Sequence, residues 1–298
     1  MFPGNCPRLS LELIDQIGLY DAIFTNPKDL NGVLPSTKRW YIAIQCLNSL
    51  LHQESLKPIS SFLITTHEEK SIAWNLAAIA PWLSVGNPSD FHYKSKALPK
   101  VVEVAREGFK APNKLSNIVS ATYRHRSEIT QLKESLFRGE TRQRDDLGMA
   151  IRRWEAQGGS WRLQVVGAML VDAMESVVHW EENAMIEDIA TSSLLLPPRP
   201  EAAPSDSPRT LADRATFVSG WQQLVDYITR LDLWKAPSLK PLVTGEQLGT
   251  ALGMKPGKWT GNALDLCLAW QLRNPHLSDP EEAIREVRAN SHSLDSHR

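Results

Sequence analysis

The chain has 298 residues, of which 42% are hydrophobic and 22% charged, a composition typical of a globular protein with at least one large core. Lysine and arginine total 33 against 34 for aspartate and glutamate, so the formal net charge is -1 and no overall positive field attracts nucleic acid or an anionic membrane. Any affinity for RNA must therefore come from local patches of positive charge.

The cysteines and the hydropathy pattern exclude several classes of protein. Cys6, Cys46 and Cys267 lie far apart without a C-x-x-C pair, which argues against a disulfide framework or a thiolate zinc site and favours a reducing compartment. No apolar run approaches the roughly 18 residues of a membrane span, so we expect no membrane partner. The first residues lack the features of a signal peptide. Because residues 7–24 already have the pattern of folded protein, we expect Met1 to be an internal position of a longer chain.

Apolar residues recur at helical spacing in nearly every long segment, whereas strand-like alternation is not sustained anywhere. The clearest stripes, in chain order, are Trp40, Ile44, Leu47 and Leu51; Ile72, Leu76, Ile79 and Leu83; Leu163, Val166, Leu170, Met174 and Val177; and Phe217, Trp221, Leu224, Ile228 and Leu231. Each stripe would face a core. We predict an all-α fold, an irregular and elongated multi-helix array without a sizeable β-sheet or a repeat of fixed period.

Breaks in this pattern suggest the domain boundaries. Residues 1–110 and 111–191 are predicted to form two successive groups of helices. Residues 192–210 combine clustered prolines with Ser and Ala, so we predict a flexible linker there.

The remaining residues are predicted to form a domain and a tail. Residues 211–275 have the pattern of a C-terminal helical domain. Residues 276–298 are polar, with little apolar surface beyond Ile284 and Val287, so we expect them to be disordered.

Motifs of catalytic and metal sites are absent. A two-metal phosphoryl-transfer site needs clustered carboxylates, usually seen as D-x-D, and the chain has no D-x-D. His67 and Glu68 begin like a zinc-protease helix, but Ser71 stands where the second histidine ligand is required. Asp145 and Asp146 are explained more simply by pairing with Arg142 and Arg144 on a charged helix face. No G-x-S-x-G, P-loop or G-x-G-x-x-G motif occurs, so we predict no catalytic residue, bound metal or cofactor in this chain.

A glycine-rich turn between two predicted helices is the strongest local signal. The segment 241–248 is followed by the turn residues 253–261, GMKPGKWTG, and by a helical run over 262–272. The second helix begins with unpaired backbone N–H groups that favour an anion, and Lys255 and Lys258 add positive charge beside them. A nucleic-acid phosphate would suit this turn. The alternative is a tight interhelical turn whose lysines only face water.

Arginines are dense between residues 123 and 161, where an RNA backbone could lie along them. The series is Arg124, Arg126, Arg138, Arg142, Arg144, Arg152, Arg153 and Arg162. The alternative is a charged helical surface balanced by nearby glutamates and aspartates. Trp154 and Trp161 could stack on bases, but tryptophans at helical spacing more often belong to a core.

Three segments, in order, resemble the eukaryotic, fungal-type CCA-adding tRNA nucleotidyltransferases. Residues 7–14 with 19–24 are similar to the helix pair that follows the catalytic head of that family. The resemblance continues in the body, in the segments 147–152 and 159–162. It ends in the C-terminal signature, in the segments 241–261 and 266–275. Together the matches extend over nearly all of residues 5–275.

This resemblance implies a non-catalytic, tRNA-holding portion. In that family a head and neck with metal-binding carboxylates use CTP and ATP to extend the tRNA 3′ end, and those motifs are absent here. Residues 1–110 then correspond to the distal neck and body, 111–191 to the body, and 211–275 to the tail. Mg²⁺ is expected only with the catalytic head. The implied location is the cytoplasm, nucleus or mitochondrion.

The implied partners are tRNA and a separate catalytic head, which could dock on apolar surface near residues 5–24. Lys255, Gly257, Lys258 and Gly261 fall where the family's tail approaches the tRNA elbow backbone. The other candidate RNA contacts are Arg124, Arg126, Arg152 and Arg153. A helical protein-interaction scaffold is the alternative function, favoured by the near-zero net charge, the abundant tryptophan and the absence of a reactive cluster.

Overall fold

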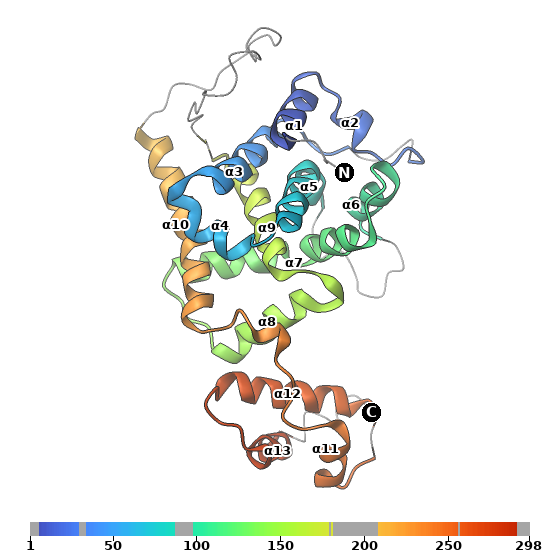
Figure 1. Ribbon diagram of the computed structural model, residues 1–298, viewed down its shortest axis with the longest axis vertical. Helices are drawn as coiled ribbons and strands as arrows, with labels where there is room; N and C mark the ends of the chain where they lie inside the picture. Colours follow the sequence, from blue (N-terminus) through green and yellow to red (C-terminus); the bar gives the residue numbers. More distant parts are fainter. Residues whose placement is uncertain are drawn as a thin grey trace. The chain divides into compact units, whose positions relative to one another are not determined.

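The computed structural model describes residues 6–29, 34–86, 98–178, 180, 208–255 and 257–290, which form helices and their connections without any strand (Figure 1). The all-α prediction is confirmed. None of the helices within these ranges is both long enough and apolar enough to cross a bilayer.

The chain folds as two compact units. The N-terminal unit comprises residues 1–138 and 157–225, and the C-terminal unit comprises residues 139–156 and 226–298. The helices of the N-terminal unit are α1 (Pro7–Gln16), α2 (Tyr20–Ile23), α3 (Trp40–His52), α4 (Lys57–Leu63), α5 (His67–Leu83), α6 (Lys100–Glu103), α7 (Asn113–Phe137), α9 (Trp161–Glu175) and most of α10 (Pro208–Arg230). Those of the C-terminal unit are α8 (Arg144–Glu155), the end of α10, α11 (Gly245–Leu252), α12 (Trp259–Arg273) and α13 (Pro280–Ala289).

This division differs from the predicted boundaries. Residues 139–156, which we expected in the second helical group, belong with the C-terminal unit, and most of α10 belongs with the N-terminal unit. Residues 192–207 of the predicted linker lie outside the described residues, while residues 208–210 are the first residues of α10.

Helix α9 is the centre of the N-terminal unit, in contact with α3, α4, α5 and α7 (Figure 1). Of its predicted stripe, Leu163, Val166, Leu170 and Met174 are buried, as are almost all other residues of the helix. Val177, the last residue of the predicted stripe, lies beyond the end of α9 and is only partly buried. Because α9 lacks a polar face, neighbouring helices cover it on several sides. At Gly167 a Cβ atom would lie 2.5 Å from Thr122 Cγ2, so this glycine allows α7 to pack closely on α9.

The segment that begins like a zinc-protease helix instead caps α5. Thr66 Oγ1 accepts a hydrogen bond from Glu69 N at 3.1 Å, and Glu69 Oε2 accepts one from Thr66 N at 3.0 Å. This reciprocal pair satisfies two backbone donors at the helix start. Among the described residues, no group of three or more His, Cys, Asp or Glu side chains comes together as a metal site.

A buried carboxylate joins three helices of the N-terminal unit. Asp172 on α9 accepts hydrogen bonds at Oδ2 from Lys133 Nζ of α7, at 2.9 Å, and from Trp221 Nε1 of α10, at 3.0 Å. The Asp172 side chain is 8% exposed and that of Lys133 is 12% exposed. Because a buried charge needs a partner, this network fixes how α7, α9 and α10 meet.

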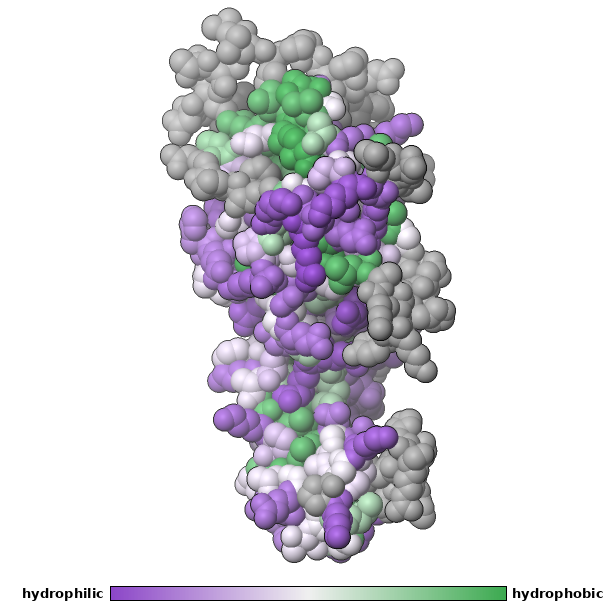
Figure 2. Space-filling view, turned by 90° about the vertical axis from the view of Figure 1, so that its right-hand side faces the viewer, coloured by the Kyte–Doolittle hydropathy of each residue, from purple (hydrophilic) through white to green (hydrophobic). Residues whose placement is uncertain are grey.

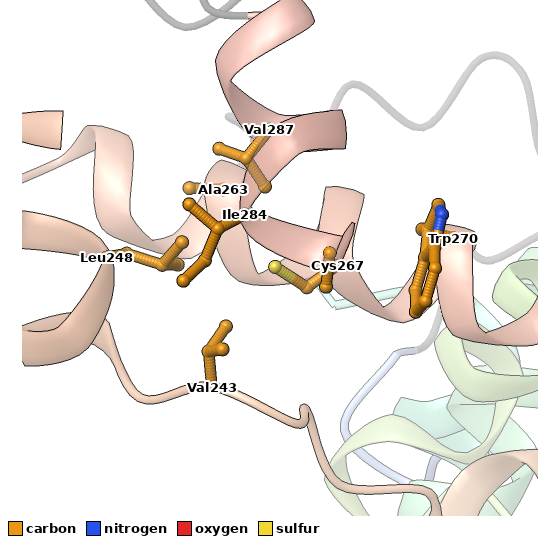
Figure 3. Packing of buried hydrophobic residues seen from close by; sticks show 8 residues of the cluster. Val243, Leu248, Ala263, Cys267, Trp270, Ile284 and Val287 are labelled. Atoms are coloured by element: carbon orange, nitrogen blue, oxygen red, sulfur yellow. The ribbon is translucent and has the colours of Figure 1, made fainter. Parts of the chain in front are cut away.

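The C-terminal unit has its own apolar core between α11, α12 and α13 (Figure 3). Its buried members are Val243, Leu248, Ala263, Cys267, Trp270, Ala283, Ile284 and Val287. Figure 3 shows Ile284 and Val287 projecting from α13 toward Leu248 and Ala263.

The prediction of a disordered tail from residue 276 is wrong for Pro280–Ala289, which form α13. Asp279 Oδ1 caps the helix by accepting a hydrogen bond from Glu281 N at 3.0 Å. Ala283, Ile284 and Val287 lie at helical spacing, so even this short apolar stripe suffices to dock the helix. Residues 291–298 lie outside the described residues.

We predict that Ile284→Ala destabilises the C-terminal unit by about 2–5 kcal/mol, because it leaves a cavity in a core shared by three helices. Urea unfolding followed by helical circular dichroism measures the change. Arg285→Ala on the exposed face is the control, with an expected change below about 0.5 kcal/mol. Equal stability of the Ile284 variant and wild type would show that α13 does not complete this core.

Candidate nucleic-acid interface

The predicted helix–turn–helix arrangement is present at residues 244–273. Thr244 and Gln247 form a capping box, in which Thr244 Oγ1 accepts from Gln247 N at 3.2 Å and Gln247 Oε1 accepts from Thr244 N at 2.8 Å. Helix α11 then ends at Gly253, whose φ of +66° is left-handed. Both ends of α11 are therefore fixed by local residues that the sequence already displays.

Hydrogen bonds also fix the turn that leads into α12. Gly257 N donates to Thr260 Oγ1 at 3.0 Å, and Trp259 Nε1 donates to Lys255 O at 2.8 Å. Thr260 Cγ2 lies only 2.5 Å from the position of a Cβ on Gly245, so the starts of α11 and α12 approach closely because residue 245 is glycine.

The candidate residues of this turn face solvent. Lys255, Gly257, Lys258 and Gly261 are all exposed, and a Cβ at Gly261 would meet no atom within 4 Å. No side chain caps the start of α12 at Lys258. Pro256 lies outside the described residues. The turn thus combines a hydrogen-bonded backbone, open space and two cations at the start of a 15-residue helix, where the helix dipole favours an anion.

The four candidate arginines do not share one unit. Arg124 and Arg126 belong to α7 in the N-terminal unit, whereas Arg152 and Arg153 belong to α8 in the C-terminal unit. Arg124 and Arg153 are exposed, and Arg126 and Arg152 are engaged within the protein.

Arg126 is buried, with 8% of its surface exposed. Its Nη2 donates to Gly86 O at 3.2 Å, and its Nη1 lies 3.5 Å from Glu175 Oε1. Burial lowers the pKa of Arg126 and raises the pKa of Glu175, while their attraction opposes both shifts. Arg126 therefore stabilises the fold, and we remove it from the candidate RNA surface.

Arg152 binds three backbone carbonyls from one guanidinium nitrogen. Its Nη1 donates to Ala236 O and Leu239 O, both at 2.7 Å, and to Pro237 O at 3.3 Å. Burial lowers the pKa of Arg152, partly offset by Asp265. Arg152 fixes the loop that follows α10, so it too leaves the candidate RNA surface.

Other members of the arginine series have internal contacts as well. Arg144 donates to Leu231 O and to Leu272 O, and the guanidinium of Arg162 lies 5.5 Å from the ring centre of Phe62. Trp154 and Trp161 are buried, in agreement with the expectation that they belong to a core.

The partner of Asp145 differs from the sequence prediction. Its Oδ2 accepts from Arg273 Nη2 at 2.6 Å and from Arg273 Nε at 2.9 Å, so Arg273 replaces the expected Arg142 and Arg144. The pKa of Arg273 is raised, mainly by its hydrogen bond to Asp145. This two-bond ion pair links α8 to α12. Because the two residues are 128 positions apart, the local spacing of charges in the sequence could not predict their pairing.

An apolar stripe lies on the exposed side of α1 and the residues just after it. Leu9, Leu13, Ile17 and Leu19 are each between 42% and 52% exposed, whereas Leu11 on the opposite side is fully buried. Figure 2 shows hydrophobic residues gathered near the top of the molecule, at the level of α1 and α2 in Figure 1. The apolar surface expected near residues 5–24 is therefore present.

We predict that Arg152→Ala destabilises the C-terminal unit by roughly 1–3 kcal/mol, because three carbonyls lose a charged donor. Arg285→Ala, at an exposed arginine of α13 in the same unit, is the control and should change stability by less than about 0.5 kcal/mol. Urea unfolding measures both variants. Equal effects of the two substitutions would contradict the assigned role of Arg152.

The chain is similar in sequence to known nucleotidyltransferases. No family model and no solved structure matches it. It is 43% identical, over 99% of its length, to "Nucleotidyltransferase lcsQ" of Purpureocillium lilacinum and covers 52% of that protein. A stretch of 69 residues, 23% of this chain, is 36% identical to the mitochondrial CCA tRNA nucleotidyltransferase of Saccharomyces cerevisiae and covers 12% of it. The chain thus spans about half the length of the relative that it matches throughout, and these matches relate it to the nucleotidyltransferases.

Proposed function

We propose that this chain is the tRNA-binding, non-catalytic C-terminal portion of a CCA-adding tRNA nucleotidyltransferase. The observation that carries the proposal is the exposed turn before α12, with Lys255 and Lys258 on a hydrogen-bonded backbone. The similarity to a CCA tRNA nucleotidyltransferase supports tRNA as the RNA, and the three ordered segments support the assignment to the C-terminal part.

The turn would hold a phosphate of the tRNA backbone. The start of α12 offers the positive end of a helix dipole, and both lysines belong to the exposed turn that leads into it. Gly257 and Gly261 carry no side chain that would keep the RNA away from the backbone. Contacts of this kind set the register and orientation of an RNA without reading its sequence. That property suits a protein that must accept many different tRNAs.

Holding the tRNA contributes to catalysis by positioning its 3′ end. A correctly placed tRNA 3′ end lowers the activation free energy of the reaction, because the reacting groups are already oriented when the reaction begins. The chain has no D-x-D motif, and its described residues gather no metal-ligating group. The proposal therefore assigns nucleotide transfer, and the Mg²⁺ that it uses, to a separate catalytic part.

The apolar stripe on α1 favours a protein-docking role in addition. Leu9 and Leu13 lie four residues apart on one face of the helix, and Ile17 continues that spacing. Because this chain covers about half of its relative, we propose that the stripe receives the catalytic part of the enzyme. A general protein-interaction scaffold would use the same stripe but would be indifferent to RNA.

We predict that Lys255→Ala/Lys258→Ala weakens binding to an intact tRNA transcript by about tenfold or more at moderate salt. Two lost phosphate contacts should also reduce the slope of log K against log salt by about 2. Fluorescence anisotropy at several salt concentrations measures both quantities.

Lys57→Ala/Lys114→Ala removes the same charge from exposed positions of the N-terminal unit and serves as the control. The proposal fails if wild type does not bind tRNA at low salt, or if the two double variants weaken binding equally.

We predict that Leu13→Glu/Ile17→Glu reduces association with the catalytic part by at least about tenfold, because charges would be buried without partners. The probe is the part of the lcsQ relative that lies outside the match, mixed with this chain and followed by sedimentation. Leu277→Glu replaces a leucine that is 47% exposed in the other unit and should have no effect. Unchanged association of the stripe variant would exclude α1 as the docking surface.

A further inference from the structure

One of the ten tryptophans differs from the others in its exposure to solvent. Eight tryptophans are buried, and Trp259 is partly buried and donates its Nε1–H to Lys255 O at 2.8 Å. Trp234, in the loop after α10, is 41% exposed. Since burial of an indole stabilises a fold, an indole kept in water suggests a binding role that the core does not explain.

The loop that carries Trp234 is anchored on both sides. Leu233 before it and Ala236 after it are buried, and Ala236 N donates to Leu233 O at 3.0 Å. Arg152 then binds the carbonyls of Ala236, Pro237 and Leu239. With its backbone fixed by α8, the loop can present the indole without a large loss of conformational entropy on binding.

Positive residues are close to the indole in sequence, and one of them contacts it. The ammonium of Lys235 lies 4.2 Å from the centre of the Trp234 ring. Arg230 and Lys240 are also exposed, and Asp232 is the sole acidic residue within residues 230–240. The segment that carries the exposed indole therefore has three cations against one anion, and the Lys235 ammonium lies over the ring.

We infer that Trp234 and Lys235 form a stacking site for an unpaired base of RNA, an inference that rests on the proposed tRNA binding. A base stacks on the indole, and the Lys235 ammonium moves from the ring to the adjacent phosphate. An apolar pocket of a protein partner fits less well, because it would have to desolvate the lysine without offering it an anion. Arg152 acts here as a positioning residue that holds the loop.

The test compares substitutions of Trp234 that distinguish aromatic stacking on a base from burial of apolar surface as the source of RNA affinity. Trp234→Phe keeps an aromatic ring, and Trp234→Leu keeps apolar bulk alone. The probes are a ten-nucleotide single-stranded RNA and a blunt-ended RNA duplex, with binding measured by fluorescence anisotropy. Thermal unfolding by circular dichroism confirms that each variant is folded.

Trp234→Leu and Trp234→Ala should weaken binding of the single strand by about tenfold or more, and Trp234→Phe by less than about threefold. Duplex binding should stay unchanged, because its bases are already stacked. Lys235→Ala should reduce the salt slope for the single strand by about 1.

Two results would overturn the stacking site: single-strand binding that does not depend on residue 234, or equal binding by the leucine variant and wild type. Failure of wild type to bind any RNA, tRNA included, would instead refute the proposed function itself. Weakening by Lys255→Ala/Lys258→Ala without any effect at Trp234 would leave the proposed function intact and remove this inference alone.

Discussion

Arginine side chains that bind backbone carbonyls near helix ends support both units of this fold. An α-helix leaves its last four carbonyl groups without partners inside the helix, and an all-helical chain has many such ends. Arg39 donates to Met174 O and Glu175 O at the end of α9, and Arg288 donates to Ala251 O near the end of α11. Arg126 binds a carbonyl just beyond the end of α5. Arg144 binds one carbonyl just beyond the end of α10 and another at the end of α12. Arg152 binds carbonyls of the loop that follows α10. Without these donors, partly buried carbonyls would lose their hydrogen bonds.

This use of arginine changes which cations are available to RNA. Arg126 and Arg152 are occupied within the protein, whereas Lys255 and Lys258 lie in an exposed turn whose backbone is already hydrogen-bonded. The proposed RNA surface therefore depends on the turn before α12 more than on the dense arginine series. Arg152 still contributes, because the loop that it holds presents Trp234.

Apolar periodicity in the sequence predicted the helices well, because it acts over one or two turns of chain. The buried stripes of α3, α5 and α9, and the glycine that ends α11, follow from such local patterns. The partners of charged residues did not follow, since Asp145 meets Arg273 only after α8 and α12 pack together. The grouping of α8 with α12 in the C-terminal unit likewise depends on contacts between segments that are distant in sequence. The docking of α13 was missed because its apolar stripe is short, although its spacing was visible.

Hydrogen exchange of the amide groups, measured by mass spectrometry with and without intact tRNA, tests the central claim most directly. If the C-terminal unit holds tRNA through the turn, exchange should slow in peptides that cover residues 253–262, at a salt concentration that permits binding. Peptides from the core of α9 should exchange at the same rate in both samples. Unchanged exchange across residues 253–262 while tRNA is bound would contradict the account and place the RNA surface elsewhere on the chain.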